Sequence, residues 1–400
     1  MADLKQNTWE TDTWYAQRVA GATDTPSASL GLYWWGKNDS GQGGFNSTAT
    51  TNYSSPVQVN TAGDWDAISS GSYATGWLKD GKLYVTGQNN PPGVLGMNQG
   101  PSNTRYSSPT QVGSNDNWAS IYFGRSACMA VKTDGTLWTW GDNPQGMLGH
   151  NNQNDYSSPK QVGTNTNWST AVGKIDGGFN RMGAIKTDGT LWGWGNSDYG
   201  NLGQNESHVY YSSPVSIGTD TNWSHITGFG GANVSAIKTD GTLWAWGSSN
   251  QGTLGLNKQG TPAHVSSPTQ VGTNTNWKTI KMGGLASNIA IKTDGTMWGW
   301  GDNENGELGL NQGSASADYS SPHQIGTNTN WNQIRGSGRV YHATTTDGSM
   351  YAWGKNLNGQ TGANNKTPGI SSPQQIAGNW DLTNITSVAY NSAYGTAFKV

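Results

Sequence analysis

Charged residues are scarce in this 400-residue chain: Asp, Glu, Lys and Arg together make up 12% of it, and the formal net charge is −3. Such a chain lacks the positive charge that drives non-specific binding to nucleic acids or to anionic membranes. No apolar run approaches the length of a membrane span, and the N-terminus has no signal-peptide pattern. We therefore expect no nucleic-acid partner, no membrane insertion, and synthesis in the cytoplasm without a signal peptide.

Cysteine is almost absent as well. The single Cys128 excludes an intramolecular disulfide, and its apolar surroundings predict a buried, inert thiol. The six histidines share no metal-ligand spacing, and no nucleophile stands in a recognisable catalytic arrangement. The stretch DNENGE at 302–307 lacks the glutamate that a calcium loop carries at its twelfth position. We expect no enzyme activity, no metal site and no cofactor.

Glycine and tryptophan are abundant instead, with 58 and 21 residues. The phrase KTDGTLWTWG at 132–141 returns almost unchanged at 186–195, 238–247 and 292–301, and three degenerate copies (LYWWG, LYVTG and MYAWG) bring the count to seven. A Ser-Ser-Pro marker and a tryptophan that mostly follows asparagine also occur seven times each, 49 to 55 residues apart. Self-similarity at such a period indicates a repeat architecture.

Each repeat has the pattern of four short strands. Asp-Gly between two β-rich runs is a strong hairpin signal, because both residues tolerate the positive φ angles of the turn. In LWTWG, the two tryptophans lie on one side of the strand, and the position between them is small in most copies. Four-stranded units repeated around an axis make a β-propeller. The sequence therefore predicts an all-β, seven-bladed β-propeller with four-stranded blades and with the tryptophan phrase in its core.

The order of the markers also predicts how the ring closes. After residue 29 the chain begins with a third-strand phrase, and it ends with the first and second strands of a repeat. Residues 380–400 and 30–60 should together complete one blade, so that N- and C-terminal strands leave no open sheet edge. We expect a propeller over residues 30–400 and a separate N-terminal arm over residues 1–29.

The run after the tryptophan phrase, GDNPQGMLG at 141–149 and GDNENGELG at 301–309, together with TDGTLWGWG, resembles the repeat of RCC1-like propellers. The resemblance covers about 370 residues and implies this fold. The family includes exchange factors for small GTPases, ubiquitin-ligase modules and an inhibitor of β-lactamase. An exchange factor would need a basic tail and an inserted wedge, which we do not find. The near-identical repeats resemble versions found in tailed phages and environmental bacteria.

Comparison of the seven copies divides the ring into two faces. The KTDGT hairpins and GTNTNW connectors of one face scarcely change, whereas the loops of the opposite face vary. Variable loops on a rigid scaffold usually carry binding groups, and aromatic residues with arginine are typical of interaction hot spots. The candidate binding residues of this face are Tyr122, Phe123, Arg125, Phe179, Arg181, Phe229, Lys281, Arg335, Arg339, Tyr341, Tyr390 and Tyr394. The alternative is that the aromatic residues fill the central channel or cover blade ends.

The N-terminal arm carries Trp9, Trp14 and Tyr15 ahead of a small, polar stretch. It could be a strap packed on a blade or a peptide that anchors the ring to a larger assembly. The resemblance favours a non-enzymatic phage virion protein, attached to capsid or tail by this arm and presenting the variable face to host surface glycans, host proteins or other virion proteins. The alternatives are a cytoplasmic RCC1-like interaction or inhibitor module and, less favoured, a guanine nucleotide exchange factor.

Overall fold

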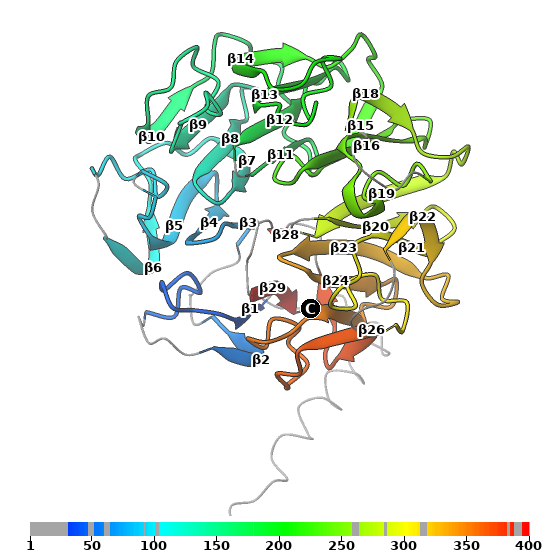
Figure 1. The fold of residues 1–400 in the computed structure, drawn as a ribbon. Coiled ribbons are helices and arrows are strands. Elements are labelled where there is room, and N and C mark those ends of the chain that lie inside the picture. The colour runs from blue at the N-terminus through cyan, green and yellow to red at the C-terminus, as the bar shows by residue number, and fades with distance from the viewer. Residues whose placement is uncertain are drawn as a thin grey trace, which may run out of the picture.

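The computed structural model describes residues 31–46, 52–59, 65–91, 93–100, 104–178, 180–257, 264–283, 286–312, 318–381, 385–387 and 394–399. Most of these residues lie in short β-strands or in the turns that join them. The strands form seven sheets, which stand around a central axis as Figure 1 shows.

The strands fall into four positions, counted outward from the axis. The inner strands are β3 (Ala67–Ser70), β7 (Trp118–Phe123), β11 (Ile175–Gly177), β15 (Trp223–Thr227), β19 (Trp277–Gly283), β23 (Trp331–Ser337) and β27 (Trp380–Asp381). The second strands are β4 (Ala74–Lys79), β8 (Ala127–Lys132), β12 (Arg181–Ile185), β16 (Asn233–Lys238), β20 (Ser287–Lys292), β24 (Val340–Thr345) and β29 (Tyr394–Lys399). The third strands, which carry the tryptophan phrase, are β1 (Gly31–Gly36), β5 (Lys82–Gln88), β9 (Leu137–Gly141), β13 (Leu191–Asn196), β17 (Leu243–Ser248), β21 (Met297–Gly301) and β25 (Met350–Lys355). The outer strands are β2 (Tyr53–Gln58), β6 (Arg105–Gln111), β10 (Tyr156–Gln161), β14 (Tyr210–Ser216), β18 (His264–Gln270), β22 (Tyr319–Gln324) and β26 (Gly369–Ile376). A short 3-10 helix, η1, covers Asn250–Gly252.

The sheets are not uniform. Six have four strands, and the sheet of β3 to β6 has a fifth, β28 (Ile385–Ser387), which pairs in parallel with β3. The prediction of seven four-stranded blades is therefore wrong, because only six blades have four strands. The sequence offers a reason: the last repeat has five residue steps from Trp380 to Ile385, where the repeat of Trp118 and Ile121 has three. β27 accordingly ends at Asp381, and the next strand pairs with the neighbouring sheet.

Both ends of the described chain share one sheet, in the order β2-β1-β29-β27. β1 pairs with β29 over six residues, from Gly31 opposite Lys399 to Gly36 opposite Tyr394. β27 pairs with the other edge of β29. The shared sheet that the marker order predicts is therefore present, and it joins the first and last strands of the ring by backbone hydrogen bonds.

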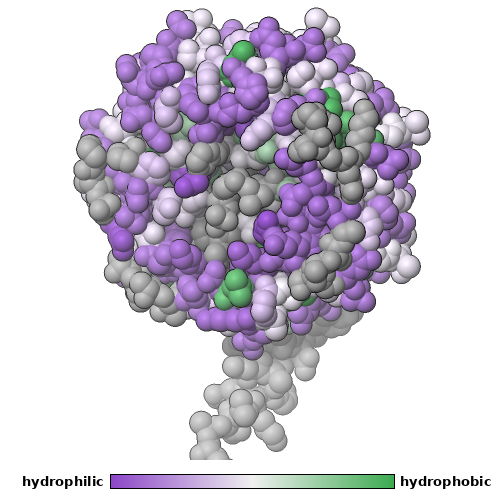
Figure 2. Space-filling view, in the orientation of Figure 1, coloured by the Kyte–Doolittle hydropathy of each residue, from purple (hydrophilic) through white to green (hydrophobic). Residues whose placement is uncertain are grey.

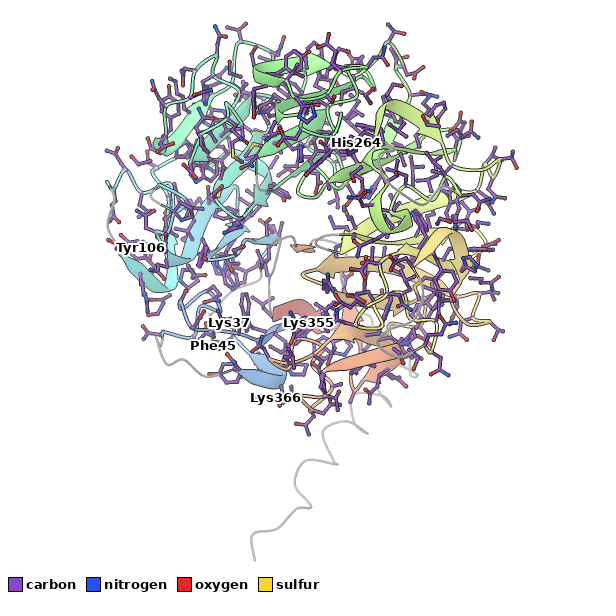
Figure 3. All side chains as sticks on the ribbon, viewed as in Figure 1. Lys37, Phe45, Tyr106, His264, Lys355 and Lys366 are labelled. Atoms are coloured by element: carbon purple, nitrogen blue, oxygen red, sulfur yellow. The ribbon has the colours of Figure 1, made fainter. Side chains whose placement is uncertain are left out.

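The second tryptophan of the phrase, present in six of the seven blades, lies between neighbouring blades. Figure 3 shows the side chains of all the described blades around the ring. The six indoles are fully buried, and each N–H donates to a backbone carbonyl in a loop of the adjacent blade. The bonds run from Trp140 to Val94 (3.1 Å), Trp194 to Met147 (2.8 Å), Trp246 to Asn201 (2.8 Å), Trp300 to Thr253 (3.1 Å), Trp353 to Glu307 (2.8 Å) and Trp35 to Gln360 (2.9 Å). In LWTWG every residue except the first tryptophan, Trp138, is buried, so most of the repeated phrase is core, as predicted.

One blade lacks this tryptophan and replaces it from the neighbouring strand. β5 has Thr86 at the position, and Trp77 of β4 turns its ring toward Gly44, as Trp140 does toward Gly96 in the next blade. The Trp77 indole N–H donates to Thr86 Oγ1 at 3.0 Å, and that hydroxyl donates to the carbonyl of Gln42 at 2.9 Å. Two residues of adjacent strands therefore supply the volume and the hydrogen bond that one tryptophan supplies elsewhere.

This replacement leads to a stability prediction. Thr86→Val keeps the shape of the side chain but leaves the buried Trp77 N–H and the Gln42 carbonyl without their partner, so we expect the free energy of unfolding to fall by about 1–3 kcal/mol. Urea unfolding followed by tryptophan fluorescence would measure the change. Thr269→Val is the matched control, since that hydroxyl bonds at the exposed surface of β18. Equal stability of both variants would contradict the role of Thr86.

The first tryptophan of the phrase is only half-buried, and it takes part in a repeated cluster with lysine. Lys132 Nζ lies 4.2 Å from the centroid of Trp138 and 4.9 Å from that of Trp118. The Trp138 N–H donates to Thr136 Oγ1, which itself donates to Asp134. The same lysine–tryptophan geometry recurs at Lys186, Lys238 and Lys292. Cation–π contacts and a hairpin hydrogen-bond network therefore explain why KTDGT scarcely varies between copies.

Candidate functional site

One position of the inner strands serves to join each blade to the next. In three blades the residue after the buried isoleucine accepts a hydrogen bond from a backbone N–H at or just after the following inner strand. Ser69 accepts from Phe123 at 2.8 Å, Asp176 from Phe229 at 2.9 Å and Thr227 from Met282 at 3.2 Å. Tyr122, at the same position of β7, instead donates its hydroxyl to the Gly177 carbonyl. The position is therefore structural in these four blades.

Lys281 and Arg335 occupy the same position in β19 and β23 and break this rule. Neither cation can accept a hydrogen bond, so the inter-blade bond cannot form through them. Arg335 donates to the carbonyl of Ile334 at 2.7 Å, and no hydrogen bond of the Lys281 ammonium is found within the described part of the chain. Both side chains are half-buried. Their presence is not explained by the packing that the other blades use.

Further basic groups surround these two cations. His225, on β15, lies near these cations, and burial lowers its pKa to about 3, so that its imidazole is neutral. Lys174, before β11, also acts on His225, and its Nζ donates to the Trp223 carbonyl at 3.3 Å. Burial also lowers the pKa of Lys174 and Lys281, and it lowers the pKa of Arg335 to about 10. The buried Asp176, whose pKa burial raises to about 6, offsets part of the charge. We call Lys174, His225, Lys281 and Arg335 the basic cluster.

A second irregularity lies beside the basic cluster. Trp118 and Ile121 are three residues apart, and the same spacing joins Trp223 to Ile226 and Trp277 to Ile280, but Trp168 and Ile175 are seven apart. The four extra residues lengthen the segment 169–174 between Trp168 and β11, in which residues 170–172 are exposed, 173 and 174 are half-buried and Ser169 is buried. Its backbone is tied on both sides: the Ile226 N–H donates to the Gly173 carbonyl at 3.0 Å, and the Ile185 N–H to the Lys174 carbonyl at 2.8 Å. The inserted loop is therefore held in a defined place.

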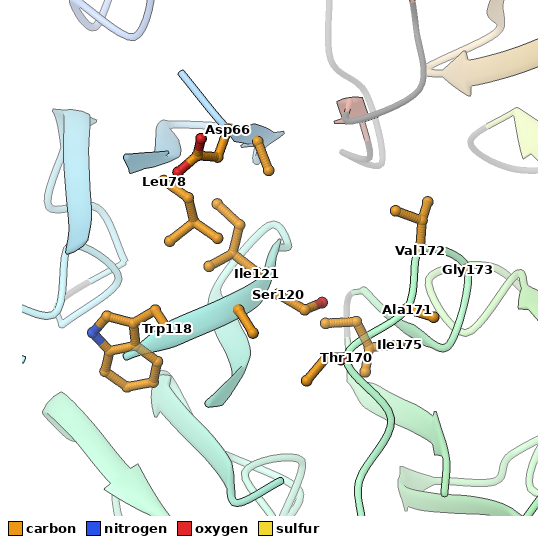
Figure 4. Close-up of a pocket in the computed structure, with 12 residues that line it drawn as sticks. Asp66, Leu78, Trp118, Ser120, Ile121, Thr170, Ala171, Val172, Gly173 and Ile175 are labelled. Atoms are coloured by element: carbon orange, nitrogen blue, oxygen red, sulfur yellow. The ribbon is translucent and has the colours of Figure 1, made fainter. Parts of the chain in front are cut away.

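The inserted loop borders a cavity of about 300 Å³ that three neighbouring blades line. Figure 4 shows Val172 and Ala171 on one side of it, facing Leu78, Ile121 and Trp118 on the other. Val172 is 49% exposed, one of four large hydrophobic residues exposed in the described chain, together with Tyr199, Tyr210 and Leu357. The face in Figure 2 is otherwise mainly hydrophilic, with small, separate hydrophobic patches. Leu78, Ile121 and Trp118 thus form an apolar wall of the cavity opposite the exposed Val172.

The structure places four of the predicted aromatic residues in the core, not on a binding face. Tyr122, Phe123, Phe229 and Tyr341 are at most 1% exposed. They act as wedges between blades: a methyl group on Gly76 would overlap the Phe123 ring, and one on Gly183 would overlap Phe229. The assignment of these four to an exposed surface is therefore corrected, in favour of the alternative that they fill the interior.

Two predicted arginines are also held by the fold. Arg181 is buried and donates to the carbonyls of Asn196 (3.1 Å) and Gly231 (2.8 Å). Arg339 pairs with Asp302 at 3.0 Å, Glu307 at 3.3 Å and also Glu304. These partners give both side chains a structural role.

The remaining predicted residues have varied positions. Arg125 is half-buried in the turn before β8, and Lys281 and Arg335 come together in the basic cluster. Tyr394 begins β29. Phe179, Tyr390 and the arm residues Trp9, Trp14 and Tyr15 lie outside the described residues.

The inserted loop was missed although the sequence carries its signal. It follows the first-strand tryptophan, so it lies toward the face of the hairpins and connectors, which the repeat comparison treats as uniform. The tryptophan-to-isoleucine spacing, seven against three, marks the insertion. At the join position the sequence has lysine and arginine where three other copies have Ser69, Asp176 and Thr227, but only the structure shows that these three accept a bond between blades.

Metal, thiol and membrane-spanning features are not marked in the described residues. Within the described ranges, no group of three or more His, Cys, Asp or Glu side chains is arranged to hold a metal ion. Cys128 is buried, and burial raises the pKa of its thiol well above the ordinary value. No described helix is long and apolar enough to cross a membrane.

Comparison with known proteins identifies the family. A family model described as the RCC1-like domain matches residues 31–398. The ultraviolet-B receptor UVR8 of Arabidopsis thaliana is 26% identical over 244 residues, which are 60% of this chain and about half (54%) of UVR8. The regulator of chromosome condensation of Xenopus laevis is 25% identical over 331 residues, 77% of this chain and 76% of that protein. The structure of Prp20p from Saccharomyces cerevisiae has the same fold, with a TM-score of 0.79, 16% identity and coverage of 94% of this chain and 92% of Prp20p. Because the family model spans most of the sequence, this chain belongs to the RCC1-like domain family.

Proposed function

We propose that this RCC1-like propeller is a non-enzymatic interaction module that binds a protein partner at the inserted loop 169–174 and the adjoining cavity. The observation that carries the proposal is the break in repeat symmetry: four residues are added where the exposed Val172 borders a cavity of about 300 Å³. The blades around it need no such insertion to fold. Prp20p, which shares the fold, has been crystallised with Kap60, and its binding to Gsp1p and histones has been characterised.

The inserted loop can be deleted while the residue spacing of the other repeats is kept. Removing residues 170–173 leaves Trp-Ser-Lys-Ile, which restores the three-residue spacing of the other copies, so we expect the variant to fold. A photo-crosslinking residue at Ser120, which lines the cavity, should form a saturable adduct with one protein in extracts of the source organism. The deletion should reduce that adduct about tenfold, since the loss of an anchor residue commonly costs 1–2 kcal/mol or more.

A crosslinker at Leu357 is the matched control, because this residue is 54% exposed but follows β25, at the opposite end of a blade from the hairpins. Little adduct is expected there. A Leu357 adduct with the same partner, or an undiminished Ser120 adduct after the deletion, would contradict binding at the inserted loop.

We also propose the virion as the setting of this interaction, with residues 1–29 anchoring the ring to capsid or tail. The support is the resemblance of the near-identical repeats to phage versions, whereas the relatives reported above are eukaryotic. The alternative is a cytoplasmic interaction or inhibitor module. Mass spectrometry of purified particles should detect the chain, and a residue 1–29 deletion should be absent from them; detection only in the cytoplasmic fraction would favour the alternative.

A further inference from the structure

Two exposed tyrosines break the repeat on the variable face, at the end of the blades opposite the inserted loop. Tyr210 is 53% exposed and Tyr199 is 39% exposed. At the position of Tyr210, two residues before Ser-Ser-Pro, the other copies have Asn52, Arg105, Asp155, His264, Asp318 and Gly369. At the position of Tyr199, before a loop glycine, four other copies have Gln145, Gln251, Asn305 and Asn358. Two aromatic rings of one blade thus stand at surface positions that are mostly polar elsewhere.

The fold holds both tyrosines in place. Tyr210 lies in β14 and pairs with Asn196 of β13. The Tyr199 ring packs on the ring of His264, which begins β18 of the next blade and is labelled in Figure 3, with the ring centroids 5.0 Å apart. A side chain on Gly200 would overlap β18, so this loop lies directly against the strand. Because three chain steps separate Asn196 from Tyr199, the Cα atoms of the two tyrosines are at most about 17 Å apart.

Polar side chains stand beside the two tyrosines. The Asn196 side-chain amide donates to Asp198 Oδ2 at 2.8 Å and to Gln145 Oε1 of the preceding blade at 3.0 Å. Asp198 and Gln145 are half-buried. Within the described part of the chain, Asp198 Oδ1 accepts no hydrogen bond and the Gln145 amide nitrogen donates none. One acceptor and one donor are therefore available next to the rings.

This combination fits an oligosaccharide better than a protein. A sugar ring has C–H groups on its faces, which suit the negative face of an aromatic ring, and hydroxyl groups at its edge, which need donors and acceptors. A protein hot spot instead needs a continuous, desolvated centre. Residues 205–208, which lead to β14, are all exposed and polar. Two rings set apart by polar groups provide stacking positions but no such centre.

The charges near the tyrosines favour an uncharged sugar. Residues 196–211 include two carboxylates, Asp198 and Glu206, and no lysine or arginine. Glu206 accepts the Tyr211 hydroxyl at 3.3 Å, and Asp198 lies near Arg181. Arg181 is buried and donates to backbone carbonyls, so it does not reach the surface. A sialylated or sulfated sugar would find no exposed cation in this segment.

We propose that Tyr210 and the Tyr199–His264 ring pair bind a neutral oligosaccharide. Its sugar rings stack on the two aromatic positions, and Asp198 and Gln145 bond to hydroxyl groups. Because the two positions are separate, an oligosaccharide that reaches both binds more tightly than a single sugar. The surface lies at the end of the blades opposite the inserted loop, so it does not depend on the proposed function.

An array of immobilised sugars would test the proposal with the full chain as the probe. It would carry neutral oligosaccharides of one to six units, in the glucose, galactose, mannose and N-acetylglucosamine series, with sialylated and sulfated forms. We expect retention of neutral chains of three or more units, above that of single sugars and acidic forms. In calorimetry with a retained hexasaccharide, Tyr199→Ala and Tyr210→Ala should each weaken binding about tenfold, whereas Tyr210→Phe, which keeps the ring, should stay within about twofold.

Leu357→Ala is the matched control, because Leu357 is 54% exposed at the same end of another blade. Its affinity should equal that of the unaltered chain, as should that of the 170–173 deletion, so failure of this site and failure of the inserted loop are distinguishable. Thermal unfolding would show that each variant remains folded. Absence of any retained oligosaccharide, stronger retention of acidic forms, or unchanged affinity of Tyr199→Ala/Tyr210→Ala would each overturn the inference. A protein captured by a photo-crosslinker at Tyr210, with no sugar retained, would assign the surface to a protein instead.

Discussion

Arg339→Met should lower the free energy of unfolding by about 3–5 kcal/mol, the cost of removing one partner from a buried charge network. Arg339, in the turn between β23 and β24, reaches into the loop after β21 and pairs with Asp302 at 3.0 Å and Glu307 at 3.3 Å. The side chains of Asp302 and Glu307 are 4% and 1% exposed. Methionine would fill much of the volume but leave both carboxylates buried without their cation.

Two comparisons would separate this network from ordinary surface pairing. Glu304→Gln removes the third acidic partner, which is 69% exposed, and should cost less than about 1 kcal/mol. Adding Asp302→Asn and Glu307→Gln to Arg339→Met should recover part of the lost stability, because no buried charge would remain unpaired. Urea unfolding curves would provide all the values. A loss below 1 kcal/mol for Arg339→Met would show that the two carboxylates are well solvated or protonated without it.

The repeat markers predicted much of the fold because a blade is a local unit. The Asp-Gly hairpins, the paired tryptophans and the order of markers at the two ends each depend on residues within one period, and they predicted the hairpins and the sheet that joins β1 to β29. The five-stranded sheet was not predicted, since β28 pairs with a strand more than 300 residues away in sequence. The sequence shows that a tryptophan is missing at Thr86 and that an additional one stands at Trp77. That Trp77 takes the place of the missing tryptophan follows only from the pairing of β4 with β5 in the structure.

The site was harder to predict because exposure depends on contacts between blades. Phe229 appears in a variable loop, yet its ring packs against Gly183, which stands 46 residues earlier and offers space only because it has no side chain. Arg339 likewise finds its partners, Asp302 and Glu307, in the preceding blade. The sequence predicts Lys281 and Arg335 as binding residues because of their charge. The stronger argument is that they replace an acceptor at the join position, and it requires the observed hydrogen bonds of Ser69, Asp176 and Thr227. Comparison of repeats at equivalent positions would have found the inserted loop.

The blade of β23 to β26 should separate from the shared sheet more easily in acid, because of His342. This residue of β24 is 6% exposed, and its Nε2 accepts the Trp35 indole N–H of β1 at 3.2 Å. Burial lowers the pKa of His342 to about 4 from an ordinary value of 6.5. The unfolded chain therefore binds the proton more readily than the folded chain between these two values, so the stability due to the neutral imidazole is intact above about pH 6.5 and is lost as the pH falls toward 4.

The difference in pKa corresponds to about 2–3 kcal/mol of folding free energy lost on going from pH 7.5 to pH 4.5. His342→Gln retains an acceptor for the Trp35 N–H but cannot take up the proton, so its loss over the same pH interval should be smaller by that amount. His264→Gln removes an exposed histidine of β18 and should keep the acid response of the unaltered chain. Burial also lowers the pKa of His150 and His225, to about 4 and about 3, which leaves a residual acid response in His342→Gln. Urea unfolding at a series of pH values would measure these slopes. If the free energy of unfolding of His342→Gln and of the unaltered chain depended on pH in the same way, acid would act on the ring through groups other than His342. The contact between β1 and β24 would then not need a neutral acceptor for its stability.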